Sequence, residues 1–113
     1  MHELGLCEGI LEAVERRAAG RRVAGVRLRV GTLHRVVEPA LDQAFALVAG
    51  GTVAEGASVE LVVVPVRVAC AACGEVTEAD HLPDACPACG ATGPDVSGGD
   101  ELVLESIKLQ APA

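Results

Sequence analysis

Four of the five cysteines in this chain form two matched pairs, each with two residues between the cysteines. A glycine follows each pair, Gly74 after the first and Gly90 after the second. A tight turn of this kind directs both thiolates of a pair toward one point, and two such turns that face each other enclose a metal ion in a tetrahedron of sulfur. The pattern therefore predicts a structural Zn²⁺ site with four ligands: Cys70, Cys73, Cys86 and Cys89.

Three other uses of these cysteines are less consistent with the sequence. Disulfide bonds within the two pairs or between them would leave Cys7 without a partner. We also expect no signal peptide at the start of the chain, and disulfides are rare in proteins that are not secreted. A thioredoxin-like redox pair would open a helix after a strand, and this chemistry does not explain two matched pairs. A rubredoxin-type iron site has the same ligands, so spacing does not distinguish it. Phe45 is the only aromatic residue available to shield an iron centre from water, which favours zinc.

The composition is typical of one small domain with a lobe that a bound metal ion stabilises. Half of the residues are hydrophobic, but Trp and Tyr are absent, so Val, Leu, Ala and Ile must build the core. A closed zinc site then matters for folding, because metal binding supplies on the order of 10 kcal/mol in small zinc lobes. The longest apolar run, at residues 61–66, is far too short to span a membrane. We expect a cytoplasmic protein with no membrane partner.

Charge is distributed unevenly along the chain, whose net charge is −7. Residues 1–35 contain seven of the nine Lys and Arg residues and four acids, whereas residues 36–113 contain two bases and twelve acids. Binding of nucleic acid needs a basic surface, so the part that holds the paired cysteines is a poor polyanion binder.

Hydrophobic periodicity predicts two helices and several short strands. Residues 3–19 have a helical apolar stripe that includes Cys7 as a buried thiol, and a second helix runs from Pro39 to Gly50. Alternating or β-branched apolar runs predict strands at residues 26–30, 59–64, 66–68 and 102–109. We place residues 59–64 at the centre of the sheet, expect a hairpin over residues 74–85, and expect a return loop over residues 92–100.

This order of elements predicts an α+β fold. Two helices and a small mixed or antiparallel sheet would form a lobe from residues 1–65 and 101–113. A zinc-ribbon-like four-cysteine lobe, residues 66–100, would be inserted into it.

The first three residues, Met1, His2 and Glu3, offer nitrogen atoms that can chelate one metal ion. Initiator methionine is normally removed only before a small residue, so we expect Met1 to remain. Its α-amine, the backbone nitrogen and Nδ1 of His2, and the backbone nitrogen of Glu3 would form a planar set. Planar nitrogen coordination suits Ni²⁺ or Cu²⁺, whereas Zn²⁺ prefers a tetrahedron. Taken alone, a histidine at position 2 is usually an ordinary terminal residue.

Several short motifs follow one another along nearly the whole chain. They are Met1-His2-Glu3, Leu6-Cys7, Val30-Gly31-Thr32-Leu33, Ala44-Phe45, the run Gly-Thr-Val-Ala-Glu-Gly-Ala at residues 51–57, and the two cysteine pairs. In this order and at this spacing, the chain resembles the HypA/HybF family of nickel metallochaperones for [NiFe]-hydrogenase maturation.

The resemblance implies a metal carrier without catalytic turnover, with Ni²⁺ as its cargo and zinc as a structural ion. It implies that His2 is the essential nickel ligand, with the Met1 amine and the Glu3 backbone contributing. The implied partners are an accessory GTPase of nickel insertion and the [NiFe]-hydrogenase large-subunit precursor, with urease maturation proteins for some members. A carboxylate near the second helix assists nickel in some relatives, and Glu38 is the nearest candidate. The family often has a histidine beside the zinc cysteines, whereas His81 lies midway between the pairs.

The rival interpretation is a zinc-ribbon module that binds nucleic acid or a transcription partner. Such a module needs a basic or aromatic face around the metal. Four acids lie between the cysteine pairs instead: Glu75, Glu78, Asp80 and Asp84. A third interpretation, a purely structural zinc adapter, predicts that His2→Ala leaves metal content and cellular function intact. We find no Ser/His/Asp set, phosphate-binding glycine loop or open three-ligand zinc site, and so predict that the protein is not an enzyme.

Overall fold

The computed structural model describes residues 2–111, with side chains from Glu3 onward, and the chain divides into two compact units. The first unit comprises Met1–Arg29, Val36–Val62 and Val103–Ala113, and the second comprises Val30–Arg35 and Val63–Leu102. The α+β fold predicted from the sequence is confirmed, with two helices, small sheets and a separate four-cysteine lobe. Among the described residues, no helix is long and apolar enough to cross a bilayer.

Two helices provide one layer of the first unit, α1 (His2–Ala18) and α2 (Glu38–Ala49). In α1, Glu3 lies in the first turn and Arg16 and Arg17 in the last, which complements the helix dipole. Helix α2 has a proline in its first turn, where the missing N–H costs no hydrogen bond. The cap of α2 is Val37, whose side chain makes no capping hydrogen bond.

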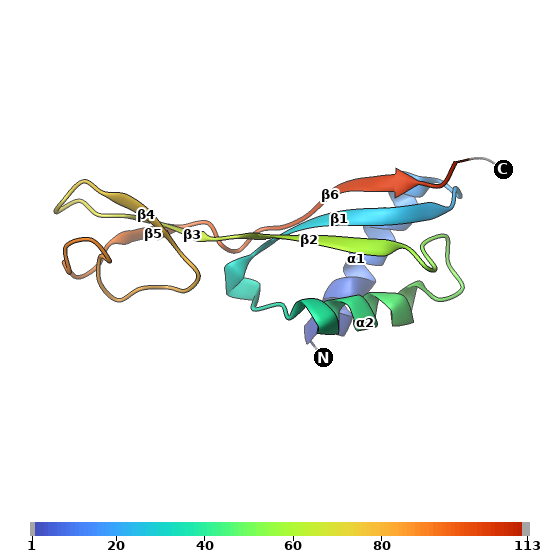
Figure 1. Ribbon diagram of the computed structural model, residues 1–113, viewed down its shortest axis with the longest axis horizontal. Coiled ribbons are helices and arrows are strands. Elements are labelled where there is room, and N and C mark those ends of the chain that lie inside the picture. Colours follow the sequence, from blue (N-terminus) through green and yellow to red (C-terminus); the bar gives the residue numbers. More distant parts are fainter. Residues whose placement is uncertain (1, 112–113) are drawn as a thin grey trace. The chain divides into compact units, whose positions relative to one another are not determined.

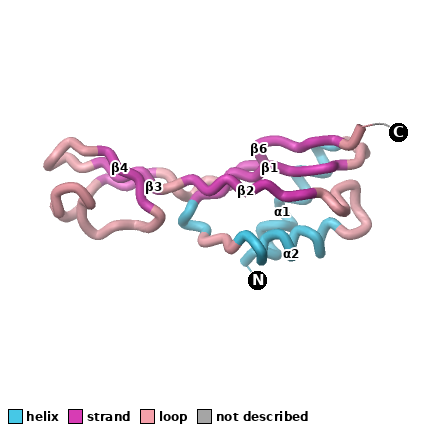
Figure 2. The backbone as a smooth tube through the Cα atoms, viewed as in Figure 1, coloured by secondary structure: helices cyan, strands magenta, loops and turns pink. Residues whose placement is uncertain are grey.

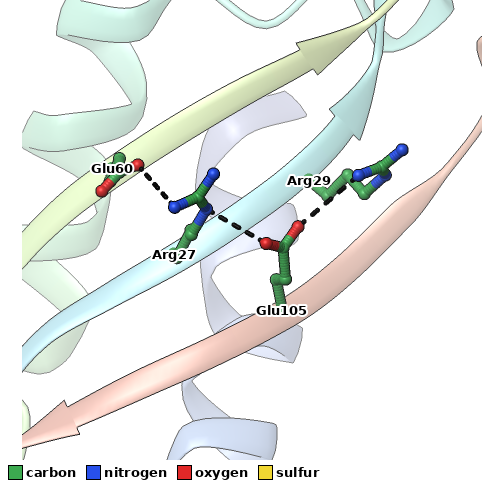
Figure 3. Close-up of polar contacts among 4 residues, drawn as sticks. All are labelled: Arg27, Arg29, Glu60 and Glu105. Atoms are coloured by element: carbon green, nitrogen blue, oxygen red, sulfur yellow. Dashed lines mark ion pairs between the residues drawn. The ribbon is translucent and has the colours of Figure 1, made fainter.

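The second layer is a three-stranded sheet in the order β2-β1-β6 (Figure 1). The strands are β1 (Val23–Gly31), β2 (Ser58–Val64) and β6 (Leu102–Leu109). Strands β1 and β2 run in the same direction, and β6 runs against them (Figure 3). The predicted central position of residues 59–64 is wrong, because β1 is central and β2 lies at the edge. A β-branched run indicates a pleated, half-buried strand and does not fix its place in the sheet.

Both helices cover the same face of this sheet, as the tube view shows clearly (Figure 2). Val26 and Leu28 of β1 are buried, and so are Val14 of α1 and Phe45 of α2. The two helices pack on each other near Cys7, whose thiol lies 3.7 Å from the carbonyl oxygen of Leu41. The core is therefore aliphatic apart from one ring, as the composition predicts.

The other face of the sheet carries a chain of ion pairs (Figure 3). Arg27 contacts Glu60 at 3.3 Å and Glu105 at 3.1 Å, and Arg29 contacts Glu105 at 3.7 Å. All four side chains are at least 36% exposed, so each pair contributes about 0–1 kcal/mol.

The second unit contains a smaller antiparallel sheet in the order β4-β3-β5. Its strands are β3 (Val66–Ala69), β4 (Val76–Ala79) and β5 (Asp95–Ser97). Two sequence predictions fail here. Residues 74–85 form no hairpin of their own, because β4 pairs with β3 across the first cysteine turn. The expected return loop over residues 92–100 contains β5, which completes the sheet on the other side of β3.

Two glycines hold the strand ends of the second unit in close contact. The N–H of Leu33 donates to the carbonyl oxygen of Gly99 at 2.8 Å, and a β-carbon at Gly31 would collide with the Gly99 backbone. Gly99 itself has a φ of +81°, and a β-carbon there would lie 2.6 Å from Val66 Cγ2. Residues 30–35 thus group with the second unit.

Candidate metal centres

The second unit brings the four paired cysteines into one cluster. Their sulfur atoms all lie within 4.8 Å of one another. Sulfur atoms of opposite pairs are 3.7 Å apart for Cys70 and Cys89 and 3.8 Å apart for Cys73 and Cys86. A tetrahedron with Zn–S bonds of about 2.3 Å has edges of about 3.8 Å. These distances are far beyond a disulfide bond of about 2.05 Å, and the cluster fits zinc.

Two matched turns place these sulfurs. The N–H of Gly74 donates to the carbonyl oxygen of Cys70 at 2.8 Å, and the N–H of Gly90 donates to that of Cys86 at 2.9 Å. Both glycines have positive φ, +77° and +81°, a backbone conformation that residues with a β-carbon rarely adopt. In the second turn, the N–H of Ala88 also points at the Cys86 sulfur, at 3.4 Å. The repeated residue pattern therefore produces a repeated backbone shape.

Backbone donors and neighbouring thiols set the acidity of the cluster. Backbone hydrogen bonds in the second turn, from Cys89 and Ala88, lower the pKa of Cys86 to about 7. The backbone at Glu75 lowers the pKa of Cys73, but desolvation and hydrogen bonds with the other thiols outweigh it and raise that pKa to about 12. Cys86 is thus the readier of these two thiols to ionise, and metal binding must displace a proton from Cys73.

The surroundings of the cluster are acidic. The second unit contains seven acids and only two bases, Arg35 and Arg67. His81 is exposed, and its Nδ1 lies 2.8 Å from Asp80 Oδ1, a hydrogen bond that lowers the pKa of Asp80. His81 is not part of the four-cysteine cluster. A surface of this charge does not suit a nucleic acid.

The predicted nickel ligands stand at the start of the first unit. Met1 lies outside the described residues, and His2 is described only as the first residue of α1. Glu3 is half-buried in the first turn of that helix. Glu38, the candidate assisting carboxylate, is the exposed first residue of α2.

Cys7 is not one of the predicted metal ligands. Its side chain is fully buried, and burial together with the nearby charges of Glu3 and Asp42 raises the pKa of its thiol to about 11. The predicted buried thiol is confirmed.

One feature of the first unit was missed in the sequence. A small groove opens between the helices and is lined by Glu3, Leu4, Ala40, Gln43, Ala44 and Leu47. No pattern within α2 alone indicates the groove, although Leu47 falls outside the buried stripe of that helix and is 76% exposed.

The fold and the cluster define a class: small α+β metal-binding proteins with a zinc-ribbon-like lobe. Within it, a model of the family described as "Hydrogenase/urease nickel incorporation, metallochaperone, hypA" matches residues 1–109. The chain belongs to this HypA family, which consists of metallochaperones, not enzymes.

Individual relatives match over almost their full length. "Hydrogenase maturation factor HypA" of Rhodobacter capsulatus is 41% identical over 112 residues, covering 96% of this chain and 99% of the relative. The protein of the same name from Alkalilimnicola ehrlichii is 42% identical, with the same coverage of both chains.

Solved structures support the fold. The solution structure of the Ni metallochaperone HypA from Helicobacter pylori aligns with a TM-score of 0.64 at 19% identity, covering 99% of this chain and all of that chain. A second solution structure of a HypA protein aligns with a TM-score of 0.56 at 20% identity, covering 96% and 90% of the two chains.

Proposed function

We propose that this protein captures Ni²⁺ at its amino terminus and delivers it to the [NiFe]-hydrogenase large-subunit precursor. The observation that carries the proposal is a Met1-His2-Glu3 start in a chain of the HypA family. In this proposal the first unit is the nickel-binding lobe. The second unit, with Cys70, Cys73, Cys86 and Cys89 as ligands, is a zinc-binding lobe that stabilises the structure.

The backbone at the start of α1 is well shaped for chelation. When two successive backbone nitrogens bind one metal ion, they close a five-membered chelate ring. Such a ring needs an N–Cα–C–N torsion, which is the backbone angle ψ, close to zero. A helical ψ of about −42° is much nearer to this value than an extended ψ of about +135°. Because α1 begins at His2, we expect a helical ψ at this residue, from which a rotation of about 40° brings the nitrogens of His2 and Glu3 onto one ion.

Hydrogen bonding and charge support the same site. The first four N–H groups of a helix have no acceptor within the helix. Deprotonation of the His2 and Glu3 nitrogens therefore breaks no hydrogen bond of the helix. Two deprotonated amides balance the charge of Ni²⁺, so the complex adds no net charge at the positive end of the helix dipole. The imidazole of His2 and the amine of Met1 complete the planar set that Ni²⁺ accepts.

The two metal sites differ in their ligands, so each site selects a different ion. Four thiolates in a closed tetrahedron suit zinc, and a planar set of nitrogens suits nickel. The nickel is cargo and must leave, so its site lies at a chain end where ligands exchange easily. An accessory GTPase would assist release in the cytoplasm, and urease maturation proteins are further candidate partners.

Nickel titration of untagged protein tests capture. Wild-type protein is expected to bind one nickel ion tightly, and both His2→Ala and an amino-terminally extended variant are expected to lose the site, since the extension removes the free amine. His81→Ala is the matched control and should bind as the wild type does. The affinity should fall as the pH drops through about 6.5, the ordinary pKa of histidine. Equal affinity in the extended variant would contradict capture at the terminus.

Delivery needs a separate test in cells that lack the endogenous maturation factor. Wild-type protein should restore hydrogenase activity, and His2→Ala should not, although both contain one zinc ion. If His2→Ala restores activity fully, the protein is a structural zinc adapter. Salt-sensitive binding of the protein to DNA or RNA would instead support the rival interpretation, a zinc-ribbon module that binds nucleic acid.

A further inference from the structure

The groove between α1 and α2 has the size of a single side chain. Its volume is about 180 Å³, and the residues that line it are mostly apolar. Small-molecule sites in proteins usually enclose about 300–1,000 Å³. A cofactor is therefore too large for this groove, whereas one aliphatic side chain from another protein fits.

Residues of α2 shape the groove for such an anchor. Ala40 and Ala44 follow one another by one helical turn, and their short side chains leave the groove open. Leu47 forms its next wall and is 76% exposed, the highest value among the described large hydrophobic side chains that are exposed. A scattered surface leucine needs no explanation, but a leucine that walls an apolar groove indicates a contact surface.

The charge around the groove indicates which partner fits. Residues 2–15 and 36–54, which contain most of α1 and all of α2, carry six acids and no Lys or Arg. Glu3 lines the groove itself, and Glu38 and Asp42 are exposed on α2. A partner segment with Lys or Arg beside its anchor complements this surface. A second copy of the chain does not, because a two-fold contact would place the acidic surface against itself.

We propose that this groove docks the protein that receives nickel, through one aliphatic side chain flanked by Lys or Arg. The inference rests on the proposed function, because the receiving protein is defined by it. Glu3 forms a wall of the groove and directly follows His2, so a segment anchored there reaches the captured ion over a short distance. Docking then makes ligand exchange an event within one complex.

The test uses Leu47→Lys, which removes an aliphatic wall and adds a charge that repels a basic segment. Leu47 is exposed, so the variant should fold, and Leu82→Lys is the matched control because Leu82 is 58% exposed in the second unit. The probe is the purified [NiFe]-hydrogenase large-subunit precursor. Leu47→Lys should weaken its binding at least about tenfold, as loss of a central hydrophobic contact does, and should slow nickel transfer. Leu82→Lys should change neither precursor binding nor nickel transfer. Leu47→Met, which keeps an apolar wall, should bind the precursor and transfer nickel as the wild type does.

Three results would overturn the inference. The first is precursor binding that Leu47→Lys leaves unchanged. The second is precursor binding that does not weaken when salt is raised, since complementary charge would then play no part. The third is a wild-type dimer that Leu47→Lys dissociates while precursor binding stays the same, which would make a second copy the occupant. Nickel affinity of the free protein is measured in parallel. Its absence in the wild type defeats the proposed function, whereas its retention in Leu47→Lys with loss of docking supports the inference.

Discussion

The sulfur atoms of Cys70 and Cys89 lie 3.7 Å apart, although the two residues are 19 positions apart in the sequence. They come from different turns, and the strands that precede, separate and follow these turns, β3, β4 and β5, form one small sheet. A sheet with strands of three or four residues has little stability of its own. The metal must therefore supply much of the free energy that folds this unit.

Cys86→Ser should cost the protein its zinc and unfold the second unit. Loss of one of four thiolates opens the tetrahedron, and Cys86 is the ligand with the lowered pKa, about 7. Zinc content and amide hydrogen exchange check this outcome, with Cys7→Ser as the control that should keep one zinc per chain. Slow exchange in residues 66–97 of zinc-free Cys86→Ser would show that the sheet folds without the metal.

Cys7 should make the protein less stable in alkali. Its thiol stays protonated in the folded state up to a pKa of about 11, whereas the unfolded thiol ionises near 9.0. The unfolded state therefore binds fewer protons between these values, and the free energy of unfolding falls as the pH rises through this range, by on the order of 2 kcal/mol. Urea unfolding of the wild type and Cys7→Ala from pH 8 to 11 measures the difference. Parallel pH profiles would contradict it.

Gly31→Ala should destabilise the second unit, because its β-carbon collides with the backbone of Gly99. Overpacking of this kind typically costs about 1–3 kcal/mol. Gly9→Ala is the matched control, since a β-carbon there meets nothing within 4 Å and alanine favours the helix. Thermal unfolding should show a lower midpoint for Gly31→Ala and a higher one for Gly9→Ala. A neutral Gly31→Ala would mean that the strand ends are more loosely packed than the structure indicates.

The ion pairs of Arg27 and Arg29 should contribute little to stability. Glu105→Gln removes two of the three pairs but should lower the free energy of unfolding by no more than about 1 kcal/mol, because the side chains are exposed. Leu28→Ala, which empties a fully buried position, should cost about 2–5 kcal/mol. Denaturant unfolding of both variants gives the comparison. A larger loss for Glu105→Gln than for Leu28→Ala would reverse the order of these two effects.

Local patterns in the sequence predicted local structure well. The apolar stripe of the first helix placed Cys7 in the core, and the repeated cysteine turns predicted the four-cysteine cluster, because both patterns depend on neighbours within a few residues. What failed depends on distant contacts. The edge position of β2, the pairing of β4 with β3, and the presence of β5 are fixed by strands that meet across the chain.

The first unit shows the same limit. The groove at Leu47 depends on how α1 packs against α2, and no periodicity within α2 alone reveals it. In the second unit, the close contact of Gly31 with Gly99 likewise joins segments that no local pattern connects. The nickel ligands are a different case, since Met1 lies outside the described residues and the site remains a prediction.

The most direct test of the central claim is X-ray absorption at the nickel edge, on zinc-loaded protein with one equivalent of nickel. Capture by Met1, His2 and Glu3 predicts a planar nickel with four nitrogen neighbours, including one from imidazole, while zinc keeps four sulfur neighbours. Nickel with sulfur neighbours, or zinc displaced from its four cysteines, would contradict the account.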